Sequence, residues 1–300
     1  MDRLKHTFTN MTKNFHERDK PVKNPQDAQI HHISSNSRLA WPPKLIHPPR
    51  LLGEVKDISG RQYPRDIGRS FHLGGHVYYI FGDTFCFNST GEFVGVTNNT
   101  IARIPNLDDP IRSQYPHPEA KVPEFVPHLR EEKTFCEEPE NQKENKRIVT
   151  WSFGGVIEVP GSAGREGWLI CDPVETHGGN AVKQNGVGIA KARVTGPDGK
   201  VECERVGEYP LFPGDGPIWG NMSNIAAPDG WTYLLSGKGL DNYMARIRTD
   251  ADFTDRGNYE FLKKSGKWER TYTEPYGPFG ELVRIACEKF IYVPHNIRFS

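Results

Sequence analysis

The sequence lacks the common signatures of catalysis on phosphates, esters and peptides. Its 300 residues contain no Gly-x-x-x-x-Gly-Lys loop, no Gly-x-Ser-x-Gly elbow, no His-Glu-x-x-His helix and no Cys-x-x-Cys pair. The five cysteines are an odd number at unrelated spacings, so we expect reduced thiols and no disulfide framework. Neither a cofactor nor a metal ion is predicted.

Net charge is absent as well. The 38 basic and 38 acidic side chains cancel, and the basic residues are scattered along the chain. Such a chain has no electrostatic attraction to nucleic acid or to an anionic membrane, and neither is an expected partner. Residues 1–20 contain no apolar run that fits a signal peptide or a membrane span, which predicts a cytoplasmic location. The sequence gives no prediction of the oligomeric state.

What the sequence does have is a recurring strand pair. A short run rich in Gly, Trp and Phe is followed by a turn and then by an apolar strand, four times along the chain. These four hairpins lie at 68–84, 151–172, 219–236 and 279–293. Weakly similar units at long spacing cannot each bury their own apolar face, so we expect them to pack side by side around an axis.

Further strands follow the hairpins. A third strand is predicted at 95–104, 186–194 and 242–248, and each contains an Ala–Arg pair, with the Ala between sheets and the Arg toward solvent. Fourth strands are predicted at 201–206 and 259–262. Four antiparallel strands per unit predict an all-β fold, a β-propeller of the five-bladed type, and leave open whether the last blade is complete.

Two segments depart from the repeat. Residues 1–50 are polar and rich in proline, which predicts a partly irregular N-terminal arm before a propeller domain at 51–300. Residues 105–147 form a Pro-rich insertion that ends in a charged run. An insertion of this length is interpreted either as a lid over one face or as a solvated loop.

The first repeat holds the most specific motif, Arg65-Asp66-x-Gly68 followed by Phe81-Gly82-Asp83-Thr84. On these residues the sequence resembles the glycosidase-like five-bladed β-propellers, in particular a family of uncharacterised domains, over roughly residues 50–300. Fungal propellers similar to this family include the hetero-Diels-Alderases of tropolone sesquiterpenoid pathways. The resemblance implies that Asp66 begins the innermost strand and points into the mouth of the central channel, whereas Asp83 is interpreted as a turn cap.

A propeller glycosidase needs carboxylates from different blades, one to protonate the leaving oxygen and another to activate water or attack carbon. Asp66 is the candidate base, and Glu281, at the start of the fourth inner strand, is the candidate acid. The second and third inner strands carry Trp151-Ser152 and Trp219-Gly220-Asn221 at the corresponding place, without a third carboxylate. Glycoside hydrolysis or carbohydrate binding is therefore kept as the alternative function.

The predicted mouth suits an apolar molecule held by a few polar anchors. Its aromatic residues are Trp151, Phe153, Trp219 and Phe279, which either shape a pocket or fill the core. The candidate catalytic residues are Asp66, Glu281, Arg69 and Asn221, and the further candidate substrate contacts are Ser223 and Arg284.

The favoured hypothesis is a cofactor-independent enzyme of fungal secondary metabolism that binds a small hydrophobic natural product. Holding two reactive groups face to face needs little acid–base chemistry, which fits a pericyclic cyclase of the hetero-Diels–Alder type. A third interpretation is a non-catalytic interaction scaffold, because many propellers have that role.

Overall fold

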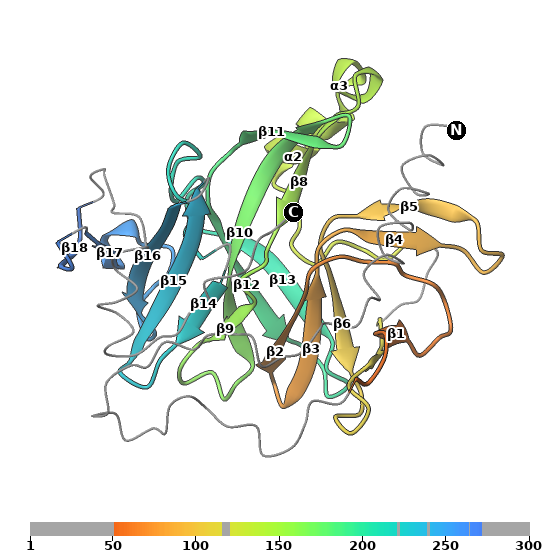
Figure 1. Cartoon of the computed structure of the whole chain (residues 1–300), viewed down its shortest axis with the longest axis horizontal. Helices are drawn as coiled ribbons and strands as arrows, with labels where there is room; N and C mark the ends of the chain where they lie inside the picture. The colour runs from red at the N-terminus through yellow and green to blue at the C-terminus, as the bar shows by residue number, and fades with distance from the viewer. Residues whose placement is uncertain (1–50, 116–120, 221–222, 239–240, 264, 272–300) are drawn as a thin grey trace, which may run out of the picture. The chain divides into compact units, whose positions relative to one another are not determined.

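The structure, a computed structural model, describes residues 51–115, 121–220, 223–238, 241–263 and 265–271. The chain divides into two compact units, residues 1–50 and 51–300, and all described residues belong to the second. The regular structure of this second unit is mainly β, arranged in antiparallel sheets (Figure 1). The expectation of an all-β fold is confirmed, with two short helices added.

The first sheet comes from the repeat that contains Asp66. Its strands β2 (Gly68–Leu73), β3 (His76–Phe81) and β6 (Thr100–Ile104) pair in the antiparallel order β2-β3-β6. The strands β4 (Thr84–Phe87) and β5 (Phe93–Thr97) form a separate hairpin. A short parallel pair joins β1 (Lys56–Asp57) to β7 (Arg112–Ser113).

The third strand predicted at 95–104 is in fact two strands, β5 and β6, because two buried asparagines between them turn their side chains to other partners. Asn98 Nδ2 donates to Asp83 Oδ1 at 2.9 Å. Asn99 Nδ2 donates to the carbonyl oxygen of Thr150, also at 2.9 Å. These bonds hold the β5–β6 junction against the turn after β3 and against the second sheet.

The second sheet is built around one long strand, β10 (Glu166–His177). Its N-terminal half pairs with β9 (Val156–Glu158) and β12 (Gly188–Val194), and β12 pairs with β13 (Val201–Val206). Its C-terminal half pairs with β8 (Lys146–Trp151) and β11 (Asn180–Gln184).

The first strand of the hairpin predicted at 151–172 is divided as well. Strand β8 ends at Trp151 and β9 begins at Val156. Gly155 between them has a φ of +81°, a conformation that does not continue a β-strand. The fourth strand predicted at 201–206 is confirmed by β13.

The third sheet pairs its strands in chain order, β14-β15-β16-β17-β18. The strands are β14 (Ser223–Ala226), β15 (Trp231–Lys238), β16 (Asp241–Arg248), β17 (Tyr259–Leu262) and β18 (Trp268–Glu269). A single 3-10 turn, η3 (Arg256–Asn258), precedes β17. The third predicted hairpin is confirmed, although β14 begins at Ser223. The fourth, at 279–293, lies outside the described residues.

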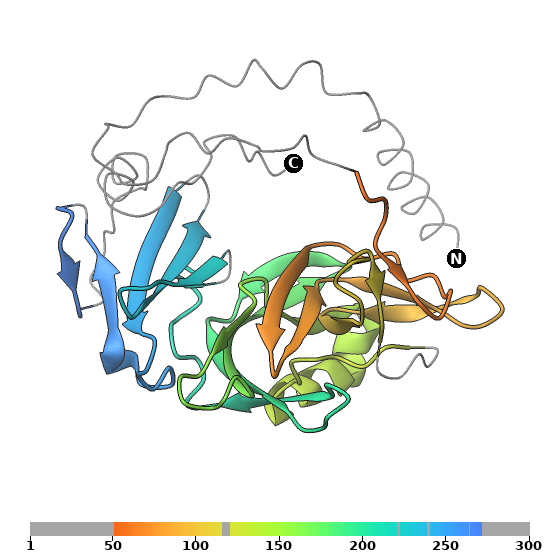
Figure 2. The same cartoon turned by 90° about the horizontal axis from the view of Figure 1, so that it is seen from below.

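The three sheets lie side by side in chain order (Figure 2). Two hydrophobic clusters join them. Along β10, Leu169 lies in the cluster that contains Phe71 of the first sheet, whereas its neighbour Ile170 lies in the cluster that contains Leu234 of the third. This alternation follows the two-residue period of a strand and covers both faces of the second sheet. The three alanines of the predicted Ala–Arg pairs, Ala102, Ala192 and Ala245, are fully buried, as expected.

The Pro-rich insertion is folded where the structure describes it. Phe125 and Val126 are buried in the cluster between the first and second sheets, and the Val126 amide donates to Asn99 Oδ1 at 2.6 Å. The helices α2 (Arg130–Glu137) and α3 (Pro139–Lys143) follow and contact β8. The solvated-loop interpretation is therefore wrong for the segment around Phe125 and Val126, because these side chains complete the core.

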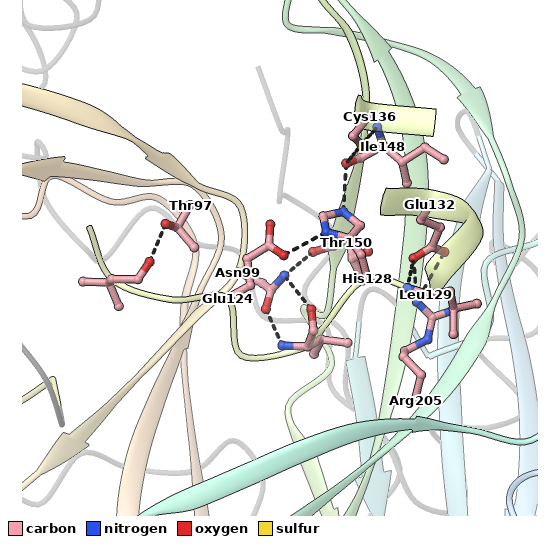
Figure 3. Close-up of polar contacts among 12 residues, drawn as sticks. Thr97, Asn99, Glu124, His128, Leu129, Glu132, Cys136, Ile148, Thr150 and Arg205 are labelled. Atoms are coloured by element: carbon pink, nitrogen blue, oxygen red, sulfur yellow. Dashed lines mark hydrogen bonds and ion pairs between the residues drawn. The ribbon is translucent and has the colours of Figure 1, made fainter. Parts of the chain in front are cut away.

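A buried ion pair fixes α2 to the second sheet (Figure 3). Arg205 Nη1, from β13, lies 3.3 Å from Glu132 Oε2, and the two side chains are only 4% and 5% exposed. The same Glu132 oxygen accepts from the Leu129 amide at 2.8 Å at the start of α2. The guanidinium carbon also lies 4.8 Å from the centre of the Tyr209 ring. The Glu132 carboxylate thus binds both the start of α2 and the second sheet.

Removing that charge is expected to be costly. Glu132→Gln leaves the Arg205 guanidinium buried without a counter-charge, and we expect a loss of about 3 to 5 kcal/mol in the free energy of unfolding. The neighbouring Glu131 is exposed, so Glu131→Gln should change stability by less than about 0.5 kcal/mol. Urea unfolding followed by circular dichroism measures both. Equal stabilities for the two variants would contradict the assigned role of the ion pair.

His128 ties the insertion to β8 through both ring nitrogens (Figure 3). Nε2 lies 2.9 Å from the carbonyl oxygen of Ile148, and Nδ1 lies 2.8 Å from Glu124 Oε2. A carbonyl oxygen and a carboxylate both accept, so each ring nitrogen must carry a proton and the ring is an imidazolium. Burial opposes this charge, but the hydrogen bond and the charge of Glu124 outweigh it and raise the pKa of His128.

This geometry predicts a pH dependence of stability. A histidine whose folded-state pKa is raised stabilises the fold fully below its unfolded pKa of about 6.5 and loses that contribution as the pH rises through the higher folded value. The unfolding free energy of the wild type relative to His128→Gln should therefore be larger at pH 6 than at pH 9. The groups that set this shift are Glu124, Glu132 and the Ile148 carbonyl. The exposed His177→Gln is the control, and a difference that grows with pH would contradict the assignment.

Candidate functional site

The inner edges of the three sheets meet around a cavity. Strands β2 and β9 contact each other, and so do β9 and β14. Between them lies a cavity of about 490 Å³. It is lined by Arg69, Ser70, Phe71, His72, Gly154, Gly155, Val156, Ile157, Glu158, Asn224 and Ala226. All three described repeats therefore contribute to one hollow.

Arg69 is the cationic side chain of this lining. It lies on β2, and its Nη1 donates to Ser223 Oγ of β14 at 2.8 Å. The side chain is half-buried, and burial lowers the pKa of its guanidinium. The sequence predicted both residues as site residues, and the structure brings them into contact across 154 positions of the chain.

Two glycines make room beside Arg69. Gly155 has a positive φ, and a β-carbon there would lie 3.5 Å from Cδ of Arg69. A β-carbon on Gly154 would collide with the carbonyl oxygen of Gly220 and with Asn224 Nδ2. Gly154 can therefore approach Gly220 and β14 only because it carries no side chain, whereas Gly155 is required by its positive φ.

Asp66 is not among the residues that line the cavity. It precedes β2 and is exposed, and its Oδ1 accepts from the Asp83 amide at 2.8 Å. The Asp83 carboxylate in turn accepts from Asn98. Loss of hydration and then the charge of Asp83 raise the pKa of Asp66. The charge of Asp83, a residue predicted as a turn cap, therefore also raises the pKa of Asp66.

Trp151 and Phe153 form a stacked pair close to Asp66. Their ring centroids are 5.7 Å apart, and both are partly buried. A β-carbon on Gly82 would collide with Asp66 Oδ1 and would lie 3.4 Å from Phe153 Cε1. Phe153 lies near Asp66 and directly precedes Gly154 of the lining, but neither Trp151 nor Phe153, both predicted as substrate contacts, is itself a lining residue.

Trp219 has a different place from the one predicted. It is fully buried and belongs to the cluster between the second and third sheets, with its ring centroid 5.1 Å from that of Phe261. It is core here and does not line the cavity. A tryptophan before an edge strand has the same local sequence in either role, which is why the sequence left both open.

The remaining predicted site residues, Asn221, Phe279, Glu281 and Arg284, lie outside the described residues. The structure adds others that the sequence analysis did not place in the site, namely Ser70, His72, Glu158 and Asn224. The one feature of the sequence that could have indicated these four residues is their position, because all of them lie on the first strands of the predicted hairpins or directly before the turn that follows. Residue type alone did not distinguish them.

In the part of the chain that the structure describes, no group of three or more His, Cys, Asp or Glu side chains is placed to hold a metal ion. No helix among these residues is both long and apolar enough to cross a membrane.

The chain has few matches among known proteins. No family model and no curated protein matches the chain. Among solved structures, a Bacteroides ovatus protein to which a hydrolase activity has been provisionally assigned is similar over 70% of this chain, with 18% identity and a TM-score of 0.48. The matched region spans only 55% of that protein's length.

Ile67, between Asp66 and β2, has a φ of +45°, which is costly for a β-branched residue, and its side chain is 48% exposed. Replacement by glycine removes the backbone strain and little buried surface. We expect Ile67→Gly to raise the free energy of unfolding by about 0.5 to 1 kcal/mol. Ile58 is 49% exposed without a positive φ, so Ile58→Gly should lower it by a similar amount. Thermal unfolding of both variants tests this, and destabilisation by Ile67→Gly would argue against strain.

Proposed function

We propose that residues 51–300 form a β-propeller of the five-bladed type and that the cavity is its central mouth. Three antiparallel units of similar strand order stand next to one another, and their inner strands β2, β9 and β14 border one hollow. The hairpin pattern at 279–293 supplies a further unit in the sequence. β-Propellers consist of antiparallel sheets that stand next to one another around an axis.

We propose further that the mouth binds a small, largely apolar molecule. The observation that carries this is Arg69, which Ser223 holds at a cavity whose other lining includes Phe71, Val156 and Ile157. The cavity volume falls in the range of small-molecule sites, which combine apolar walls with a few placed polar groups. Arg69 is the polar anchor, and an oxygen of the bound molecule is its acceptor.

Within this proposal the activity is a cyclisation of the hetero-Diels–Alder type. Holding two reactive parts of one molecule in near-attack geometry supplies on the order of 7 to 11 kcal/mol of the barrier. A guanidinium that donates to a conjugated carbonyl draws electron density from the reacting system and stabilises charge that develops on that oxygen. Arg69 has the position for this role, and the substrate class is a small hydrophobic natural product.

Glycoside hydrolysis is a second candidate, and one observation favours it. Asp66 and Asp83 are neighbouring carboxyl groups in different environments: Asp83 accepts from Asn98, while the pKa of Asp66 is raised. Such a pair suits one acid and one base. However, neither residue lines the cavity, where Glu158 is the carboxylate in reach. The cyclase is therefore preferred.

Calorimetric titration with 1-acetonaphthone, a neutral aryl ketone, tests binding in the cavity. We expect saturable binding by the wild type and at least tenfold weaker binding by Ala226→Phe, because the added ring fills the space beside β14. Ala181→Phe, an exposed strand position on β11, is the matched control and should bind like the wild type.

The same protein should release no aryl alcohol from a panel of aryl glycosides. Turnover of a glycoside that is lost in Asp66→Asn but kept in Asp108→Asn, an exposed aspartate away from the cavity, would contradict the cyclase and favour the hydrolase. Binding that is equal in Ala226→Phe and Ala181→Phe would show that the cavity is not the site.

A further inference from the structure

We infer that the molecule bound in the cavity carries an anionic oxygen group, such as a carboxylate, that pairs with Arg69. This inference rests on the proposed function of the cavity and narrows its ligand from an apolar oxygen compound to an apolar acid. It is carried by a charge that the described protein leaves without a counter-charge.

No described carboxylate lies within ion-pair distance of Arg69, and its hydrogen bond goes to the neutral hydroxyl of Ser223. Burial lowers the pKa of its guanidinium, and no charge of a described residue contributes to that shift. A guanidinium has five N–H donors, so most of its hydrogen-bonding capacity remains for a ligand. A half-buried cation without a counter-charge is stabilised when an anion enters the cavity.

Three other arginines of the described structure show how a buried guanidinium can be compensated. Arg205 pairs with Glu132, and Arg246 lies 2.6 Å from Glu260 while its guanidinium packs 4.0 Å from the Trp231 ring centre. Arg65 has no carboxylate, yet it donates to Ser113, to Tyr115 and to a backbone carbonyl, and lies over the Phe81 ring. Arg69 differs from Arg205 and Arg246 in having no described carboxylate as a partner, and from Arg65 in lining the cavity.

The surroundings of Arg69 favour an anion with two oxygens. Arg69 Nη1 donates to the Ser223 hydroxyl, which anchors one end of the guanidinium beside the cavity. A fixed guanidinium matches a carboxylate with two parallel hydrogen bonds. A neutral carbonyl would supply one acceptor and no charge. The apolar lining residues Phe71, Val156 and Ile157 then receive the body of the acid.

Glu158 is the lining residue that opposes an anion. It is exposed and forms no ion pair with Arg69. Its negative charge beside the same cavity weakens anion binding through solvent, by a modest amount. This gives the proposal two variants with opposite expected effects: removing the Arg69 charge weakens the binding of an acid, and removing the Glu158 charge strengthens it.

The experiment is calorimetric titration of the full chain with 2-naphthoate and with its neutral analogue 2-naphthamide. We expect the wild type to bind the acid at least tenfold more tightly than the amide, and Arg69→Gln to lose this preference. Arg69→Lys keeps the charge without the planar fork and should retain part of the preference. Glu158→Gln should strengthen acid binding about twofold to fivefold relative to amide binding. Arg112→Gln removes an exposed cation of the same charge and should alter neither.

Equal binding of acid and amide by the wild type would overturn the inference and leave the proposed apolar cavity intact. A preference for the acid that survives in Arg69→Gln would also overturn it, because another cation would then be responsible. If neither compound bound, and 1-acetonaphthone did not bind either, the proposed function of the cavity itself would be wrong. Circular dichroism of each variant confirms that a lost preference does not reflect unfolding.

Discussion

The second sheet has two apolar faces, and this constraint organises the rest of the described fold. Alternate residues of β10 and β12 are apolar on both sides, so no single neighbour can cover the sheet. The first sheet covers one face and the third covers the other. Small side chains at the contacts, such as Ala190 and Ala245, let the sheets approach closely. Because β9 lies at the inner edge of this central sheet, the packing also decides where β2 and β14 meet it.

The candidate site follows from that convergence. An inner edge strand offers its side chains to a neighbouring sheet on one side and to the central hollow on the other, as Leu73 and Ser70 of β2 illustrate. Arg69 reaches across to Ser223 because two edges from distant parts of the chain are held at a fixed distance by the cores behind them. A rigid β-framework therefore positions one cation without any catalytic motif, which explains why motif searching alone does not find the site.

Local pattern predicted the strands well, whereas contacts between distant residues decided the rest. The hairpins at 68–84 and 219–236 follow from glycine and aromatic residues within a few positions, and such signals are visible in the sequence. The folded part of the insertion depends on Asn99 and on the pairing of Glu132 with Arg205, which are 73 residues apart. The burial of Trp219 likewise depends on Phe261. The sequence alone does not show which distant residues pair. It therefore left the insertion as either a lid or a solvated loop and did not show that the insertion completes the core.

Charge separates the structural from the functional side chains more clearly than residue type does. Glu132 with Arg205 and Glu124 with His128 are opposite charges that meet away from solvent, and each pair ties the insertion to the sheets. An uncompensated charge in the same environment would cost stability and gain nothing for the fold. Natural sequences keep an uncompensated buried charge chiefly where a bound ligand supplies the counter-charge. Arg69 has this property at the centre of the sheets, in a cavity large enough for a small molecule, and so the charge balance and the geometry point to the same place.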